Sequence, residues 1–216
     1  MMRPLLAALL IAAPVGASAQ PRRVPPVDQC ASDRSFVAFR SGLNAAIARR
    51  DAATILSIVS DDISYSFGDA PGRAGFAEAW RLDRPAASPL WRELGAALRL
   101  GCARDREGAL WAPSMSMPNE DDPDDATYGG IVVAVAPGAA LRAAPSDRAR
   151  IVAPLRYDVL VLPPDDDGRG AWVRAEMDER RRGWIRRSQV RAFTDYRAVF
   201  EKRGGRWRMT AFVAGD

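Results

Sequence analysis

The chain has 216 residues, of which 48% are hydrophobic and 27% are charged, a balance that is typical of globular proteins and excludes disorder of the whole chain. Its formal net charge of +4 is too small to predict nucleic-acid binding on its own. The chain contains no histidine, which excludes the commonest general base, the usual zinc ligand and the histidine-activated Ser and Cys nucleophiles.

The first 19 residues have the three parts of a cleavable secretory signal peptide. Arg3 supplies the basic start, residues 5–14 form the apolar run, and Ala17-Ser18-Ala19 is a small-residue cleavage site. The apolar run is too short for a transmembrane helix, which needs roughly 20 residues. We therefore predict a periplasmic or secreted protein whose mature chain begins near Gln20 and has no transmembrane segment after cleavage. Lipid anchoring is not indicated, because no cysteine follows the cleavage site directly.

The two cysteines of the chain, Cys30 and Cys102, both fall in the predicted mature part. Export would place them in an oxidising compartment, so we predict a disulfide between them. The alternative interpretation is two separate buried thiols. In either case the sequence predicts no thiolate nucleophile and no sulfur-ligated metal site.

A Pro-rich lead over residues 20–31 precedes two predicted helices and a strand. Ser32 or Asp33 is a good N-cap for the first helix, and Asp51 is a good N-cap for a second, shorter helix. The alternation of apolar and polar residues over residues 63–67 predicts a half-buried strand. The apolar face of the first helix comprises Phe36, Phe39, Leu43 and Ile47.

The predicted N-terminal module extends over residues 32–118 and contains two more helices and another strand. A brief helix is expected over residues 74–80, a longer one begins at Ser88-Pro89 and ends at Gly101, and a strand is expected over residues 109–112. An acidic linker follows over residues 119–128. Its carboxylates lack the ligand spacing of a calcium loop, so we predict a solvated linker, with no metal and no cofactor.

From residue 129 to residue 191 the sequence changes to short β-rich runs that turn residues separate, a pattern that predicts a small barrel. A terminal hairpin then covers residues 192–216, with a tight turn at Gly204-Gly205. Together with the N-terminal helices, these strands predict the α+β class. The expected barrel strands are residues 131–135, 151–152, 159–162, 171–174 and 183–185; the expected second hairpin strand alternates, with Trp207, Met209, Ala211 and Val213 on one face.

Residues 129–191 resemble the bacterial SH3-like domain family. The segment from Ala139 to Ser146, an apolar strand with an Arg followed by Pro-Ser, is similar to the opening motif of that family. Trp172-Val173-Arg174 and Gly183-Trp184-Ile185 are similar to its paired Trp-containing strands. The chain departs from the family pattern at Ala140, where Asn is usual, and at Ala144, where Gly is common. The resemblance implies a small β-barrel that binds peptides.

Residues 32–115 and 195–214 resemble, less closely, the cone-shaped α+β fold of nuclear transport factor 2 and the SnoaL-like proteins. Paired N-terminal helices, a Gly-Arg-x-Gly-Phe turn at residues 72–76 and a terminal Gly-Arg-Trp-Arg-Met segment carry this resemblance. It implies that the barrel is an insertion and that the terminal hairpin packs on the N-terminal module. The alternative is a helical domain followed by a barrel with an extra hairpin.

The candidate ligand-binding residues of the barrel are basic and aromatic. Arginines over residues 180–187, with Arg191 beyond them, concentrate positive charge on a barrel edge, where charged residues also serve as protection against aggregation. Trp172 and Trp184 are candidates for a shallow peptide groove, although packing in the core is the other interpretation. The ligand-binding candidates are therefore Trp172, Trp184, Arg181, Arg182 and Arg186.

These features predict a non-catalytic, exported binding or adaptor protein of the cell envelope, with a peptidoglycan peptide or an envelope protein as its partner and no nucleic acid. A structural stabiliser of a larger envelope complex is a further interpretation. The alternative, from another functional class, is a small-molecule-binding or weakly catalytic pocket in the N-terminal module. The resemblance of this module to the cone-shaped family implies a carboxylate in that pocket. Asp61 and Asp62 are interpreted as capping and solubilising residues. The candidate pocket residues are Tyr65, Asp69, Trp80 and Trp111.

Overall fold

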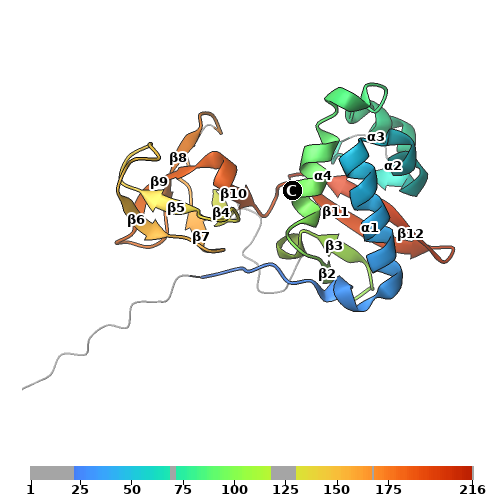
Figure 1. Cartoon of the computed structure of the whole chain (residues 1–216), viewed down its shortest axis with the longest axis horizontal. Coiled ribbons are helices and arrows are strands. Elements are labelled where there is room, and N and C mark those ends of the chain that lie inside the picture. Colours follow the sequence, from blue (N-terminus) through green and yellow to red (C-terminus); the bar gives the residue numbers. More distant parts are fainter. Residues whose placement is uncertain (1–21, 69–71, 118–129, 167, 216) are drawn as a thin grey trace, which may run out of the picture.

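The computed structural model describes residues 22–68, 72–117, 130–166 and 168–215. The predicted signal peptide, the acidic linker and Asp69 lie outside these residues. The described part of the chain has the α+β class expected from the sequence, with two separate sheets and two hydrophobic cores (Figure 1). We call residues 30–117 with 193–215 the first module, residues 130–192 the second module, and residues 22–29 the strap.

The helices of the first module begin at the polar residues that the sequence marks as caps. The Asp33 carboxylate accepts hydrogen bonds from the backbone N–H groups of Ser35 and Phe36, and Asp51 accepts one from Thr54. These contacts confirm both predicted N-caps. The helices are α1 (Arg34–Arg49), α2 (Ala52–Ile58), α3 (Arg73–Ala79) and α4 (Leu90–Leu98), with short 3-10 turns at Gln29–Ser32, Pro85–Ala87 and Ser114–Ser116. A further 3-10 turn, Arg187–Gln189, lies in the second module.

The first sheet combines strands that precede the second module in the sequence with strands that follow it. Its order is β1-β12-β11-β3-β2, with β1 parallel to β12 and the other pairs antiparallel. The terminal hairpin β11–β12 therefore lies in the middle of this sheet, with N-terminal strands on both sides, and the second module lies between β3 and β11 along the chain. The strands are β1 (Val59–Ser64), β2 (Ala103–Arg104), β3 (Leu110–Ala112), β11 (Arg197–Arg203) and β12 (Arg206–Val213).

The N-terminal strand of this sheet begins earlier than predicted. It covers Val59–Ser64 rather than residues 63–67, since parallel pairing with β12 places Val59 opposite Met209. Val59 and Ile63 are fully buried. Tyr65 is half-buried and Phe67 is exposed, and both lie beyond the end of the strand.

A β-bulge changes the buried face of β12. Phe200 is opposite Met209, but the next residue of β11, Val199, is opposite Ala211, so that Thr210 is the extra residue on β12. After the bulge Phe212, and not Ala211, is completely buried. The predicted alternation of Trp207, Met209, Ala211 and Val213 on one face is therefore wrong beyond Met209.

Aromatic side chains fill the core between the helices and the sheet. The Phe36 ring of α1 lies 5.0 Å from Trp207 and 5.5 Å from Phe200, measured between ring centroids. Trp80, just after α3, lies 4.8 Å from Tyr196 and 5.0 Å from Phe212. These contacts link the N-terminal helices to the terminal hairpin, so the two parts of the first module share one core.

The second module contains a seven-stranded antiparallel sheet in the order β10-β4-β7-β8-β9-β5-β6. Each predicted barrel strand overlaps one of these strands, whereas β10, like β2 of the first module, was not predicted. No closed barrel is found among the described residues, since β10 and β6 are the two ends of the sheet. The strands are β4 (Ile131–Ala134), β5 (Ala140–Arg142), β6 (Ile151–Pro154), β7 (Val159–Val161), β8 (Trp172–Glu176), β9 (Arg182–Arg186) and β10 (Val190–Ala192).

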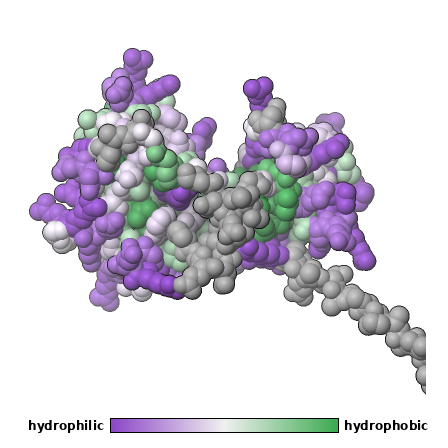
Figure 2. Space-filling model, turned by 180° about the vertical axis from the view of Figure 1, so that it is seen from behind, coloured by the Kyte–Doolittle hydropathy of each residue, from purple (hydrophilic) through white to green (hydrophobic). Residues whose placement is uncertain are grey.

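The visible surface is mainly hydrophilic on the outer sides of the two modules. Figure 2 shows apolar residues gathered toward the middle of the molecule on the face that it presents. None of the helices in the described ranges has the length and apolar character needed to cross a membrane.

Candidate binding surface

The β8–β9 hairpin presents one face to solvent and the other to the core of the second module. Val173 and Ala175 are buried on the inner face of β8, opposite Ile185 and Gly183 of β9. Because successive side chains of a strand point to opposite faces, the residues between them lie on the outer face. Those outer residues are Trp172, Arg174 and Glu176 on β8 and Arg182, Trp184 and Arg186 on β9.

Tryptophan and arginine alternate across the two strands of this outer face. Trp172 is directly opposite Arg186, whose guanidinium carbon lies 4.8 Å from the indole centroid. Arg174 is directly opposite Trp184, at 5.3 Å from that indole centroid. Each pair is a cation–π contact that orients the cation over the aromatic ring and leaves the indole half-buried. We call Trp172, Arg174, Trp184 and Arg186 the Trp–Arg ladder.

Carboxylates neutralise much of the positive charge that the sequence places on this edge. Arg186 donates to Asp147 at 2.8 Å, and Arg181 donates to Asp178 at 2.7 Å. These hydrogen bonds lower the pKa of both carboxyl groups, so each stays ionised beside its arginine. Arg182 lies 3.8 Å from Glu176. The arginine edge is therefore a set of paired charges and not a continuous basic patch.

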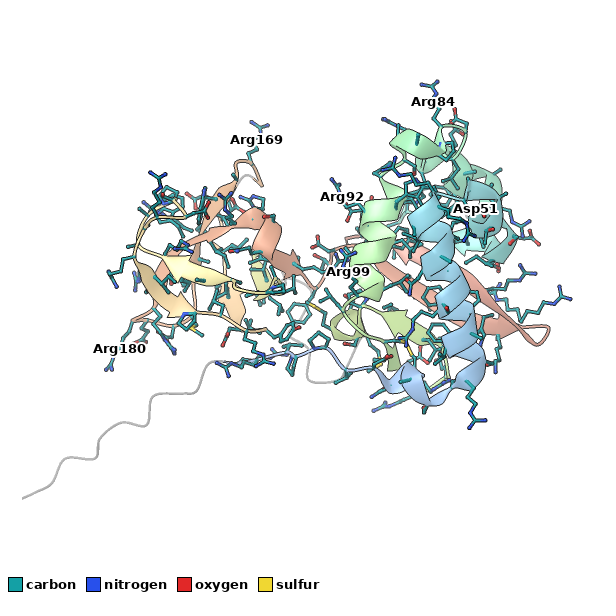
Figure 3. The ribbon with its side chains drawn as sticks, in the orientation of Figure 1. Asp51, Arg84, Arg92, Arg99, Arg169 and Arg180 are labelled. Carbon is teal, nitrogen blue, oxygen red and sulfur yellow. A yellow bond between two sulfur atoms is a disulfide. The ribbon has the colours of Figure 1, made fainter. Side chains whose placement is uncertain are left out.

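The guanidinium groups of two arginines of this region have no carboxylate partner among the described residues. Arg174 is exposed and contacts Trp184 only through the cation–π pair. Arg180 is at the tip of the β8–β9 turn and projects away from the module (Figure 3). Arg174 is consequently the guanidinium on the ladder that remains available to an incoming anion.

Arg191, which the sequence interpretation placed on the charged edge, is buried. Its side chain is 7% exposed, and it donates to the backbone carbonyl of Tyr196 at the start of the terminal hairpin. Burial lowers the pKa of Arg191 and raises that of Asp195, the carboxyl group nearest to it in the chain. Arg191 therefore belongs to the connection between the modules, and its assignment to the surface is wrong.

The candidate pocket residues of the first module that the structure describes have three different environments. Trp80 packs in the aromatic core, while the indole nitrogen of Trp111 donates to Asp105 at 2.8 Å. The Tyr65 hydroxyl fills the space beside Gly75, where an added Cβ would lie 2.0 Å from its oxygen. Asp69 lies outside the described residues.

The two acidic residues that the sequence interpretation assigned to capping are held in ion pairs. Asp61 lies 2.7 Å from Arg73, and Asp62 lies 2.5 Å from Arg203. The hydrogen bond from Arg203, followed by that from Ser60, lowers the pKa of Asp62 to about 2. Such a carboxylate is a poor general base at neutral pH, because its proton affinity is too low.

A polar cavity of about 380 Å³ in the first module was not predicted from the sequence. It lies between the start of α1, the β2–β3 turn and the β11–β12 hairpin, and its lining includes both charge signs. Lys202 is over the Trp207 ring at 4.9 Å and lies 3.9 Å from Asp33. The residues that line this cavity are too far apart in the sequence for a local pattern to indicate them. The lining comprises Asp33, Arg104, Glu107, Gly108, Ala109, Glu201, Lys202 and Trp207.

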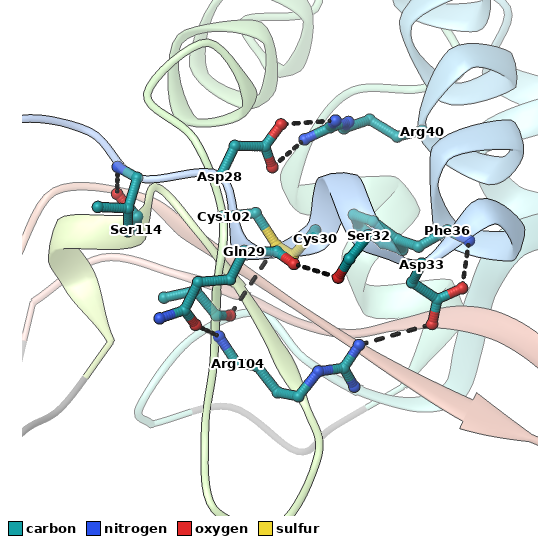
Figure 4. Close-up of a disulfide and its surroundings, with 12 residues drawn as sticks. Asp28, Gln29, Cys30, Ser32, Asp33, Phe36, Arg40, Cys102, Arg104 and Ser114 are labelled. Carbon is teal, nitrogen blue, oxygen red and sulfur yellow. Dashed lines mark hydrogen bonds and ion pairs between the residues drawn. A yellow bond between two sulfur atoms is a disulfide. The ribbon is translucent and has the colours of Figure 1, made fainter.

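The predicted disulfide between Cys30 and Cys102 is confirmed, and it joins the residue that follows the strap to the residue that precedes β2 (Figure 4). Both cysteines are buried, and their Cα atoms are 5.7 Å apart. The N–H of Gln29 donates to the Cys102 carbonyl, and the N–H of Cys102 donates to the Val27 carbonyl. Arg40 of α1 donates to both carboxylate oxygens of Asp28, at 2.7 and 2.8 Å.

Comparisons of the chain with models of protein families, with curated proteins and with solved structures find no match. Among the described residues there is no group of three or more Cys, Asp or Glu side chains that could hold a metal ion. The acidic run of the linker, Glu120 to Asp125, lies outside those residues.

Proposed function

We propose that this protein is an exported, non-catalytic binding or adaptor protein of the cell envelope, and that it binds a peptide through the outer face of the β8–β9 hairpin. The N-terminal sequence pattern and the confirmed disulfide support export, because disulfides persist in oxidising compartments. The partner would be a peptidoglycan peptide or a segment of an envelope protein.

The second module would be a bacterial SH3-like domain in this proposal. The positions of the family motifs in the sheet support it, since Leu141-Arg142 lies in β5, Trp172 begins β8 and Trp184 lies in the centre of β9. Gly183 allows β9 to approach β5 closely, because a Cβ there would lie 2.5 Å from the Arg142 carbonyl oxygen. The same glycine therefore serves both the motif and the packing of the sheet.

The first module would have the cone-shaped α+β fold and serve as a support for the second. The central position of the terminal hairpin in its sheet supports this assignment. The aromatic core supports the structural role over the pocket alternative, because Trp80, one of the pocket candidates, lies within that core. The polar cavity next to Lys202 is the place where a small molecule with both charge signs would fit if the pocket alternative were true.

The Trp–Arg ladder is the observation that carries the proposed function. An indole that is half-buried beneath a guanidinium offers an apolar surface, and the adjacent guanidinium donates hydrogen bonds to a carboxylate. Arg174 has no competing carboxylate among the described residues. A peptide that brings a carboxylate to Arg174 and an apolar group to the indoles would match this surface.

Retention on isolated peptidoglycan tests the proposal. The Arg174→Gln variant and the Trp172→Ala/Trp184→Ala variant are expected to lose retention, while the chain with Trp111→Ala keeps it. Trp111 is the matched control because it is a half-buried indole of the first module. Equal retention of all variants would exclude the ladder, and loss in the Trp111 variant alone would favour the pocket alternative. Failure of the unaltered protein to bind would exclude the cell-wall version.

A further inference from the structure

The strap continues across the second module as an added strand. The backbone N–H of Val24 donates to the Tyr157 carbonyl at 2.8 Å, and the N–H of Val159 donates to the Arg22 carbonyl at 2.9 Å. These two bonds form an antiparallel bridge between Arg23 and Asp158. Figure 1 shows the strap in blue, extending from the second module to the first.

The segment that the strap covers has a bonded strand on its other side. The N–H of Tyr157 donates to the Ala134 carbonyl, and the N–H of Ala134 donates to the Asp158 carbonyl. The strap therefore occupies a free backbone edge next to the β4–β7 ladder, as an extended peptide does in strand addition.

The Asp158 side chain selects one residue of the strap. It is 0% exposed, its Oδ1 atom accepts a hydrogen bond from Arg23 Nε at 2.8 Å, and its Oδ2 atom accepts one from the N–H of Arg156 at 2.6 Å. Arg23 itself is 59% exposed, so the cation reaches the buried carboxylate from the surface. The neighbouring Arg22 is exposed and forms no ion pair within the described residues.

The two ends of the strap are held with different strength. Near Cys30 the strap is fixed by a disulfide, by backbone bonds to Cys102 and by the pair of Asp28 with Arg40. At the second module it is held by two backbone hydrogen bonds and one ion pair. Pro25 and Pro26 separate these two ends. The end at the second module is thus the replaceable one.

We propose that the Tyr157–Val159 edge, with Asp158 beneath it, is a strand-addition site for an extended peptide segment of a partner protein that carries an arginine opposite Asp158. The strap is the intramolecular occupant of this site. Backbone hydrogen bonds supply affinity that does not depend on sequence, and the buried carboxylate supplies selectivity for the cation. Because the strap is tethered at Cys30, it competes at high effective concentration, and the partner binds by displacing it. This site uses no residue of the Trp–Arg ladder.

The test is fluorescence anisotropy with a labelled, acetylated peptide of residues 22–27, Arg-Arg-Val-Pro-Pro-Val, and the mature chain from Gln20. Arg23→Ala in the protein removes the ion pair of the strap but leaves Asp158 in place. This variant is expected to bind the peptide about tenfold more tightly than the unaltered chain, since a hydrogen bond between charged groups no longer holds the competitor. Arg22→Ala is the matched control, because it removes an equal charge without an ion pair, and it should bind as the unaltered chain does.

A second protein variant and a second peptide keep the test independent of folding defects. Val24→Pro in the protein removes the N–H that donates to Tyr157 and should also raise peptide affinity. A peptide in which glutamate replaces the second arginine should not bind any of these proteins. Equal affinity for Arg23→Ala and Arg22→Ala, or binding of the glutamate peptide, would overturn the proposal. A stable dimer of the unaltered chain whose formation the peptide inhibits would overturn it too, because a second copy would then be the occupant.

Discussion

Val59 and Met209 are opposite each other in the parallel ladder of β1 and β12, although one precedes and the other follows the whole second module in the sequence. Both side chains are completely buried. The core of the first module is therefore incomplete until the end of the chain has been added.

We expect that a chain truncated after Ala192 does not fold its first module. Truncation removes β11 and β12, the central strands of the sheet, together with the fully buried Phe200 and Phe212. Loss of even one such phenylalanine costs about 3–5 kcal/mol, which is a large fraction of the roughly 5–15 kcal/mol that stabilises a typical domain. Circular dichroism and a free-thiol assay would measure this. A chain that ends at Gly215 is the control, and helical content equal to the control would refute the expectation.

Local sequence patterns predicted the parts of this fold that depend on neighbouring residues. Asp33 and Asp51 begin helices because their carboxylates reach backbone N–H groups only two or three residues away. Gly204 and Gly205 both have positive φ angles, as the predicted hairpin turn requires. The paired cysteines followed from the predicted compartment.

Features that depend on distant partners were not visible in the sequence. The bulge at Thr210 results from pairing with β11, and it moves Phe212 to the core face. The paired charges of the arginine edge depend on carboxylates such as Asp147 and Asp166, which come from other loops. The strap was interpreted as a Pro-rich lead, because its partner at Asp158 is 135 residues away.

Removal of the disulfide should destabilise the protein. The bond between Cys30 and Cys102 closes a loop across 72 positions, so the Cys30→Ser/Cys102→Ser variant should lose about 4 kcal/mol of unfolding free energy in the chain-entropy model. Urea unfolding at neutral pH measures the difference. The unaltered protein in excess reductant is the control and should show the same loss. If reduction leaves the unfolding midpoint unchanged, the constraint on the unfolded chain is not a source of stability.

Two glycine substitutions should have opposite effects on the stability of the protein. An alanine at Gly183 would place its Cβ 2.5 Å from the Arg142 carbonyl oxygen, and the resulting separation of β9 from β5 should cost about 1–3 kcal/mol. An alanine at Gly42, in the exposed middle of α1, meets no atom within 4 Å and should stabilise the helix by up to about 1 kcal/mol. Thermal unfolding of Gly183→Ala and Gly42→Ala would show the two signs. A stable Gly183→Ala variant would contradict the close approach of the strands.

The ion pair of Asp62 and Arg203 should contribute to stability above pH 4 and lose that contribution in acid. Arg203 lowers the pKa of Asp62 to about 2 in the folded protein, against 3.8 for the free side chain. Because the unfolded chain takes up the proton first as the pH falls, the stabilising contribution decreases from about pH 4 to about pH 2. The pair lies at the surface, where solvent screening limits its contribution to less than about 1 kcal/mol.

Urea unfolding of Asp62→Asn at several pH values tests this expectation. The variant should be slightly less stable than the unaltered protein at pH 6, and most of the difference should be lost at pH 2, where Asp62 is about half protonated in the folded protein and almost fully protonated in the unfolded chain. Arg203→Gln should reproduce this behaviour, and the two substitutions together should cost less than their sum, because they remove the same interaction. A difference at pH 6 that persists unchanged at pH 2 would mean that Asp62 acts through packing rather than through its charge.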